Sequence, residues 1–398
     1  MQDLLLLVWV DFSFMKIKKY KLKYSKKDIS FVKDEIEKSL KLGYLTDGGP
    51  NISKFESLWC KFNNSKNAIA VSNCTAGLEC ILRAIDIKGY SVVVPAYTFI
   101  ASVMSIYNCM GKPVYADISK ETLSLSLEGI KKAVQLDTKA IMIVHVGGII
   151  TNEIEDIRKY CDENNLFLIE DAACAHGASF NGKMAGNFGH AGCFSFHHSK
   201  VLTSGEGGII TTDSDSLAYR IKRTRAIGLD RSINNYESFD IGSNAKMSEI
   251  TAILAILHTK KGKKILSERR RIADLYDKGI NFSKDIMQFH IPKNTVSGYY
   301  KYFLLTKNRK VRNKLTKFAR SKGVDLPPAT YTYTCDKQKI SKKMECILGT
   351  NLDNSHYMSE HNICLPMYNG LKKKEVKYII SVVNKFIEMS RSENKIKN

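Results

Sequence analysis

The sequence contains no pair of cysteines spaced as C-x-x-C, and no apolar stretch is long enough to cross a membrane. The ten cysteines therefore give no sign of a zinc site or of a thioredoxin-like redox centre. Several lie in apolar runs, as Cys80, Cys109 and Cys193 do, which is typical of buried free thiols in a reducing compartment. We expect a cytoplasmic protein with no metal and no membrane-inserted segment.

Acidic residues are scarce relative to basic ones, with 40 Asp and Glu against 61 Lys and Arg, so the net charge is +21. A charge of this sign suits nucleic acid, an anionic substrate or an anionic surface. The lysines are spread along the chain, and neither zinc-finger spacing nor a helix-turn-helix signature accompanies them. We interpret the charge mainly as a solvated surface and expect no nucleic-acid partner.

Both ends of the sequence are expected to be tails. Residues 4–10 are apolar but too few to span a membrane, and neither a basic stretch before them nor a small-residue cleavage site after them marks a signal peptide. Residues 16–27 are strongly basic, and Met15 is a candidate for the true start. We therefore assign residues 1–27 to an N-terminal tail and residues 391–398 to a polar, frayed tail.

The middle of the chain alternates short apolar runs with helical patterns. Strands are expected at residues 68–71, 91–94, 114–116, 141–144 and 167–169, and helices at 76–84, 101–109, 127–134 and 153–163. Continuous apolar strands separated by helices predict an α/β fold with a mostly parallel sheet covered on both faces. We place this large domain at residues 28–255.

The pattern changes from about residue 247. Helices are expected at residues 247–259, 268–278, 312–321 and 375–389, with a strand at 299–306. These elements predict a smaller α+β domain, which we place at residues 256–390. A chain of 398 residues that is 44% hydrophobic is long enough for two domains with full cores.

A lysine and an aspartate follow successive strands of the predicted sheet. Asp171 ends a buried strand, and Lys200 stands between the apolar run 194–196 and a glycine-rich turn. Ligands of such sheets collect beyond the carboxyl ends of the strands. These two residues are what a pyridoxal phosphate (PLP) site needs, because the amine forms an imine and the carboxylate keeps the pyridine nitrogen protonated. The simpler alternatives are a surface lysine and a carboxylate paired with a nearby cation or helix start.

Four further segments suit the same cofactor. The turn holding Cys74 and Thr75 begins a helix whose free N–H groups could bind a phosphate, although it could also be an ordinary helix cap. Phe99 could stack on a flat ring or belong to the core. Ser195 could offer its hydroxyl to the phosphate, and Asn244 precedes a helix that it could instead cap.

The order of these motifs resembles that of the DegT/DnrJ/EryC1/StrS family of PLP-dependent sugar aminotransferases, from about residue 43 to residue 386. The matching segments are residues 43–50 with 55–56, 95–99, 170–173, 194–208, 244–249, 268–276 and 365–368. The resemblance implies a fold-type-I PLP-dependent transferase that works as a homodimer with shared active sites.

The resemblance also implies a role for each site residue. Lys200 would hold the cofactor as an imine and shuttle the proton, and Asp171 would pair with the pyridine nitrogen. The phosphate would be held by the backbone of Cys74, by Thr75 and Ser195, and by Asn244 of the partner subunit, while Phe99 would stack on the ring. Cys174 stands near the phenolic oxygen where the family usually has Gln or His, and Asn73-Cys74 replaces Ser-Gly.

By this resemblance, the enzyme moves an amino group from an amino acid, such as glutamate, to a nucleotide-linked keto-sugar. Such products enter surface polysaccharides, including the O-antigen of lipopolysaccharide, or the sugars of secondary metabolites. The alternatives are a dehydratase or an aminohydroxybenzoate-type enzyme of the same family. Lys200 disfavours the dehydratase, because some relatives that dehydrate sugars carry histidine at that position. A nucleic-acid-binding protein is suggested only by the charge.

Overall fold

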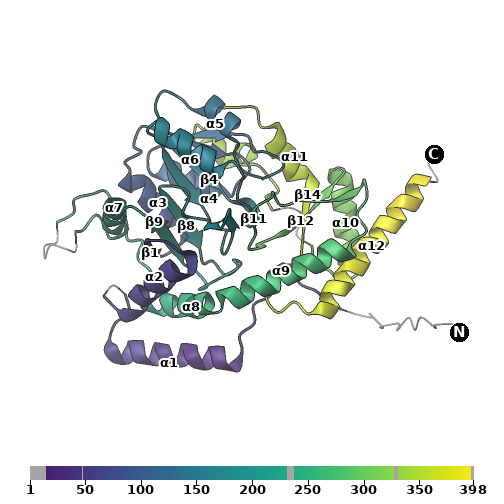
Figure 1. Cartoon of the computed structure of the whole chain (residues 1–398), viewed down its shortest axis with the longest axis horizontal. Coiled ribbons are helices and arrows are strands. Elements are labelled where there is room, and N and C mark those ends of the chain that lie inside the picture. The colour runs from purple at the N-terminus through teal and green to yellow at the C-terminus, as the bar shows by residue number, and fades with distance from the viewer. Residues whose placement is uncertain (1–14, 47, 231–236, 327–329, 396–398) are drawn as a thin grey trace.

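The computed structural model describes residues 15–46, 48–230, 237–326 and 330–395 (Figure 1). Its centre is a sheet in the order β1-β9-β8-β5-β4-β2-β3-β13. The strands are β1 (Asn67–Val71), β9 (Gly208–Thr212), β8 (Ala191–Ser195), β5 (Phe167–Asp171), β4 (Thr138–Val144), β2 (Ser91–Pro95), β3 (Lys112–Ala116) and β13 (Ile347–Leu348). β9 is antiparallel to both of its neighbours and the other pairs are parallel. The predicted mostly parallel sheet is confirmed.

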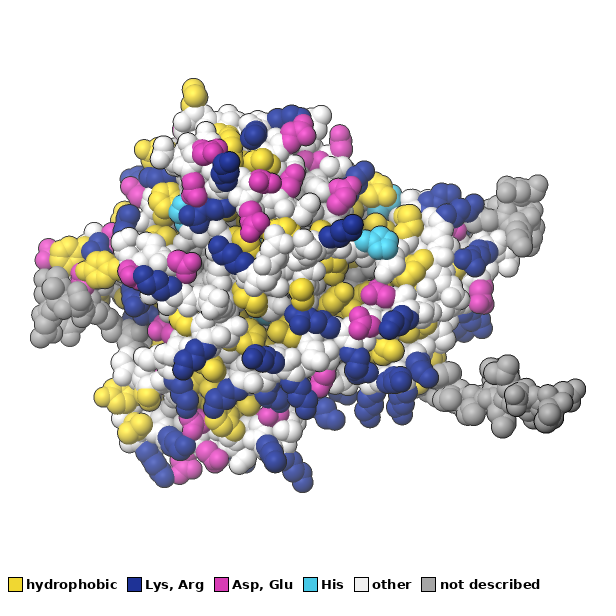
Figure 2. Space-filling model, viewed as in Figure 1, with side chains coloured by type: hydrophobic (Ala, Val, Ile, Leu, Met, Phe, Trp, Pro, Cys, Tyr) yellow, Lys and Arg dark blue, Asp and Glu magenta, His cyan; other side chains and the backbone are white. Residues whose placement is uncertain are grey.

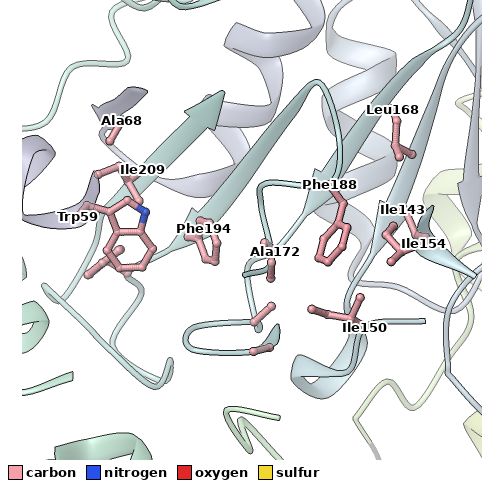
Figure 3. Close-up of a cluster of buried hydrophobic side chains, with 14 of the residues drawn as sticks. Trp59, Ala68, Ile143, Ile150, Ile154, Leu168, Ala172, Phe188, Phe194 and Ile209 are labelled. Atoms are coloured by element: carbon pink, nitrogen blue, oxygen red, sulfur yellow. The ribbon is translucent and has the colours of Figure 1, made fainter. Parts of the chain in front are cut away.

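Helices cover both faces of this sheet. One face packs against α2 (Pro50–Asn63), α5 (Leu127–Ala133), α6 (Ile154–Glu163) and α8 (Glu249–Lys260), and the other against α3 (Cys74–Ala84), α4 (Ile100–Asn108) and α7 (Asp215–Arg225). Successive strand residues point to opposite faces, so Ile141 and Ile143 join the first core and Met142 the second. Figure 3 shows the first core, where Trp59 and Phe194 lie over the sheet. The strands are apolar on both sides because both sides are covered.

The C-terminal part builds a smaller α+β unit, as predicted. Its sheet pairs β10 (Ile286–Gln288), β12 (Tyr302–Thr306) and β14 (Asn362–Leu365) antiparallel, and it packs with α9 (Gly262–Gly279), α10 (Arg309–Ser321) and α12 (Lys373–Lys395). β6 (Ser179–Phe180), β7 (Lys183–Met184) and β11 (Thr295–Val296) form a third small sheet, and α11 (Asp353–His361) precedes β14. The domain limits stay a prediction, since β13 comes from the C-terminal part but pairs with β3 of the large sheet.

The described part of the expected N-terminal tail packs on the protein. Ile17 is buried and pairs with Val324, and α1 (Lys26–Leu42) follows with a capping box at Ser25. Between them Tyr20, Leu22 and Tyr24 are half-buried, while the intervening lysines at 19, 21 and 23 are exposed. Residues 4–10, the apolar run of the sequence, lie outside the described residues. At the other end α12 continues to Lys395, into the expected C-terminal tail.

The basic residues gather on the surface of the described chain. Figure 2 shows Lys and Arg side chains along the lower edge of the molecule, over α8 and α9. All ten cysteines lie within the described residues and none is in a disulfide. In the part of the chain that the structure describes, no helix has the length and apolar character needed to cross a membrane.

Candidate active site

A cavity of about 420 Å³ opens beyond the carboxyl ends of the parallel strands. Seven of the eight predicted site residues line it: Cys74, Thr75, Phe99, Asp171, Cys174, Ser195 and Lys200. The eighth, Asn244, does not. The opposite wall comes from the C-terminal part of the chain, through residues 300–301 and 330–331. The predicted clustering at the strand ends is therefore present in one chain, apart from Asn244.

The turn between β1 and α3 presents the start of a helix to this cavity. Asn73 caps α3 by accepting a hydrogen bond from Ala76 N–H at 2.9 Å, and the N–H groups of Cys74 and Thr75 have no partner within the helix. The Thr75 hydroxyl has no hydrogen-bond partner among the described residues. A Cβ on Gly208 would lie 2.8 Å from Cys74 N, so glycine at this position lets β9 touch the turn. The helix cap is therefore confirmed and leaves room for an anion at the same turn, and the binding of a phosphate there stays a prediction.

Cys74 contributes backbone, not sulfur, to the cavity wall. Its thiol donates to the carbonyl of Cys193 on β8 at 3.6 Å, and the Cys193 thiol donates to the Cys74 carbonyl at 3.5 Å. The hydrogen bond with Cys193 and burial raise the pKa of the Cys74 thiol well above its ordinary value. Cys74 is therefore a neutral packing residue at the start of α3.

Asp171 ends β5 with a carboxylate that is 6% exposed. One oxygen accepts from the Ser102 hydroxyl at 2.7 Å, and the other from Ala173 N–H at 3.1 Å. Among the described residues, no Lys or Arg lies within ion-pair distance of it. Of the two simpler alternatives, pairing with a cation is therefore not what the described residues show, whereas Ser102 does lie in the first turn of α4 (Ile100–Asn108). The acceptor capacity that remains faces the cavity and can take a further donor.

Lys200 points into the cavity from the loop after β8. Its ammonium donates to Cys174 Sγ at 3.2 Å and lies 4.7 Å from the centre of the Tyr300 ring. Burial by itself would lower the pKa of Lys200, but Cys174, Tyr300 and Asp171 outweigh it and raise the pKa. A thiol is a weak acceptor, so the ammonium has no strong hydrogen-bond partner. The surface-lysine alternative is wrong.

Phe99 and Ser195 both line the cavity but differ in exposure. Phe99 caps the start of α4 and is 63% exposed, whereas the nearby Tyr97 is fully buried and packs edge-on against Tyr331. Of the two aromatics in this segment, Tyr97 is thus the core residue and Phe99 is free to cover a ligand. Ser195 is buried at the end of β8, and its hydroxyl accepts from His197 N–H at 3.3 Å.

Asn244 is exposed in an extended segment that pairs with Ala226. It does not cap α8, because Ser248 does so by accepting from Thr251 N–H at 3.1 Å. The buried carboxylate of Glu249 instead accepts two N–H groups at the start of α2. A contact of Asn244 with a cofactor in the partner subunit stays a prediction.

Sequence reasoning missed the part of the wall formed by Tyr300 and Lys301. These residues lie more than 90 positions after Lys200, and no motif marks them. It also left Glu170 without a role. The structure shows Glu170 fully buried and bonded to three backbone N–H groups of residues 186–189. Only the packing of distant segments reveals both features.

The fold and cavity together are those of a fold-type-I transferase, with a lysine and a buried aspartate at the strand ends of one α/β domain. The chain belongs to the DegT/DnrJ/EryC1/StrS aminotransferase family, whose model matches residues 27–384. It is a sugar aminotransferase of this family, and its cofactor is pyridoxal phosphate.

Individual relatives match over nearly their whole length. GDP-perosamine synthase of Vibrio cholerae is 31% identical over 350 residues, which cover 86% of this chain and 93% of the relative. The enzyme of the same name from Escherichia coli O157:H7 is 30% identical over 357 residues, covering 89% and 95%. The crystal structure of S. venezuelae DesV in complex with a ketimine intermediate superposes with a TM-score of 0.87 over 94% of this chain and 99% of that one. At 23% identity it supports the fold.

Proposed function

We propose that this enzyme transfers an amino group from an amino acid, glutamate, to a nucleotide-linked keto-sugar. The observation that carries the proposal is the Lys200 amine beside Cys174, in a cavity that Asp171 and the start of α3 also line. The names of the GDP-perosamine synthases support a nucleotide-linked amino sugar as product. We place that product in surface polysaccharide, such as O-antigen, or in secondary-metabolite synthesis, and the enzyme in the cytoplasm.

The residues of the cavity suit pyridoxal phosphate. The N–H groups at the start of α3, the free Thr75 hydroxyl and Ser195 would bind the phosphate. Asp171 would accept from the protonated pyridine nitrogen, and Phe99 would cover the ring. Lys200 fits as well, because its amine reaches into the same cavity, where the Cys174 thiol and the Tyr300 ring are its contacts among the described residues.

When bound, pyridoxal phosphate supplies an aldehyde that carries the amino group and a ring that accepts an electron pair from the donor's α-carbon. Lys200 Nζ would hold the cofactor at rest and, once displaced by the donor, would move the proton at that α-carbon. Asp171 would hold positive charge at the ring nitrogen in a site that excludes most water. Cys174 lies against Nζ and would face the oxygen that the family's Gln or His contacts.

A homodimer with shared sites belongs to the same proposal. Asn244 is exposed, so it is free to reach a partner's cofactor phosphate. Four apolar side chains near the end of α1 are about half exposed: Leu40, Leu42, Tyr44 and Leu45. A cluster of this kind on a single chain supports a subunit interface.

Absorbance spectroscopy tests the proposal directly. Purified protein with PLP should show the visible band of a lysine-bound cofactor, and glutamate should bleach it. Lys200→Ala should lose both the band and turnover, while Lys278→Ala, which removes an exposed lysine on α9, should keep both. Turnover and an intact band in Lys200→Ala would contradict the assignment. A sugar product that loses water without gaining nitrogen would favour the dehydratase instead.

A further inference from the structure

A second lysine, Lys301, lines the same cavity as Lys200. Lys301 immediately precedes β12, and its ammonium lies 4.8 Å from the centre of the Tyr300 ring. Lys200 places its own ammonium 4.7 Å from the same ring centre. The two cations therefore lie within about 10 Å of each other, with the Tyr300 ring in contact with both.

The charge of Lys301 is not neutralised by the protein. Within the described chain, no carboxylate lies at ion-pair distance from it, and its side chain is half-buried. The two acids that line the cavity have other partners than Lys301, since Asp171 bonds Ser102 and Glu206 lies 3.8 Å from His197. In the neighbouring cavity, which Lys301 also borders, Asp277 accepts from Gln288 and from a tyrosine hydroxyl. Lys301 thus offers an unpaired ammonium to an anion that enters the Lys200 cavity.

The size of the cavity decides which anion this is. About 420 Å³ accommodates a cofactor and a small amino acid. A nucleotide-linked sugar is much larger, so its diphosphate has to lie toward the mouth or outside. An amino-acid donor must bring its amine to Lys200, which places its side chain inside the same cavity.

We propose that Lys301 binds the side-chain carboxylate of the amino donor and thereby selects a dicarboxylic amino acid over donors with uncharged side chains. The assignment rests on the proposed function. The proposed function names glutamate as the donor, and the assignment of Lys301 adds the residue that makes glutamate preferred.

Three variants isolate this charge. Lys301→Met removes the ammonium but keeps much of the side-chain length, Lys301→Arg keeps the charge, and Lys307→Met removes an exposed lysine at the far end of β12 as a matched control. Two measurements are made on the PLP-loaded enzyme. One is the donor concentration that half-saturates bleaching of the visible band, for glutamate and for 2-aminobutyrate. The other is the calorimetric Kd of glutarate, a dicarboxylate with no amine to react.

Lys301→Met is expected to raise the half-saturating glutamate concentration and the glutarate Kd about tenfold or more, and to change the 2-aminobutyrate value less than about twofold. Lys301→Arg should restore most of the glutamate preference, and Lys307→Met should match the wild type. An equal loss with both donors would place Lys301 on the α-carboxylate and overturn the proposal, as would unchanged glutarate binding.

The calorimetric measurement separates the two proposals. Glutarate binding needs no turnover, so it tests the role of Lys301 whether or not an amino acid bleaches the band. If no amino acid bleaches the band of the wild type, transamination itself is refuted. If glutamate bleaches the wild type and Lys301→Met behaves identically in both measurements, only the role of Lys301 is refuted.

Discussion

Glu170 and Asp171 are adjacent buried carboxylates at the end of β5, and we predict opposite consequences for their amide variants. Oε1 of Glu170 accepts from the N–H groups of Phe188 and Gly189 at 2.7 and 2.6 Å. Oε2 accepts from Gly186 N–H at 2.7 Å and lies 2.7 Å from His145 Nε2. All four contacts stay within the protein, so Glu170 holds the chain around residues 186–189 against the sheet.

Glu170→Gln places an NH₂ group against donors whichever way the amide turns. Toward Phe188 and Gly189 it faces two N–H groups. Toward His145 it lets the ring accept, but Gly186 N–H is then opposed and the ring proton moves to Nδ1, which has no partner. Each buried group left unsatisfied costs about 1–3 kcal/mol, so the loss is about 2–6 kcal/mol. That is a large part of the 5–15 kcal/mol that stabilises a typical domain.

Asp171→Asn should have almost no effect on stability. The Ser102 hydroxyl can rotate to suit an amide, and the Ala173 N–H keeps an oxygen acceptor, so the change in unfolding free energy should stay within about 1 kcal/mol. The variant does remove the negative charge proposed to face the pyridine nitrogen. Turnover should therefore fall about 10²- to 10³-fold, the usual effect of deleting a pre-positioned electrostatic group.

Two measurements are made on each variant. One is the thermal melting temperature without added cofactor, and the other is turnover per folded enzyme at a temperature well below the melting range. Glu170→Gln should melt about 4–24 °C below the wild type, at about 2–4 °C per kcal/mol, and keep most of its turnover at low temperature. Asp171→Asn should melt with the wild type and turn over poorly. A low-melting Asp171→Asn together with a wild-type-like Glu170→Gln would refute the assignment of the two carboxylates.

Two further predictions concern stability in acid and assembly. His176 is buried against Trp59 without a hydrogen bond, and burial lowers its pKa to about 3. It is therefore neutral in the folded protein and takes up a proton on unfolding. Its contribution to the free energy of unfolding is complete above pH 6.5 and is lost as the pH falls from 6.5 toward 3. Between pH 6.5 and pH 5, the free energy of unfolding measured with denaturant should therefore fall by about 2 kcal/mol less in His176→Leu than in the wild type. Parallel pH profiles of this free energy in the two proteins would contradict the prediction. The solution mass measured by light scattering should be that of a dimer, and Asn244→Ala should raise the Kd for PLP; a fully active monomer would refute the shared site.

The sequence predicted the half of the site that local chemistry determines. Asp171, Lys200 and the turn at Thr75 each sit where a strand ends, and parallel strands bring their ends to one edge without further information. The other half depends on how the C-terminal unit docks, so Tyr300 and Lys301 could not be placed. The same limit hid the pairing of β13 with β3, because a two-residue strand has no periodicity to detect.

The two cysteines that depart from the family pattern have different consequences, and only their surroundings separate them. Cys74 turns its thiol away from the cavity to the carbonyl of Cys193, so its backbone can bind a phosphate as a glycine would. Cys174 Sγ accepts a hydrogen bond from Lys200 Nζ at 3.2 Å. A substitution at Cys74 therefore changes packing at the start of α3, whereas one at Cys174 changes the hydrogen bonding of the proposed catalytic lysine. Of the two, only Cys174 contacts the proposed catalytic lysine, so it is the position where the departure expected from the resemblance would change the chemistry as well as the packing.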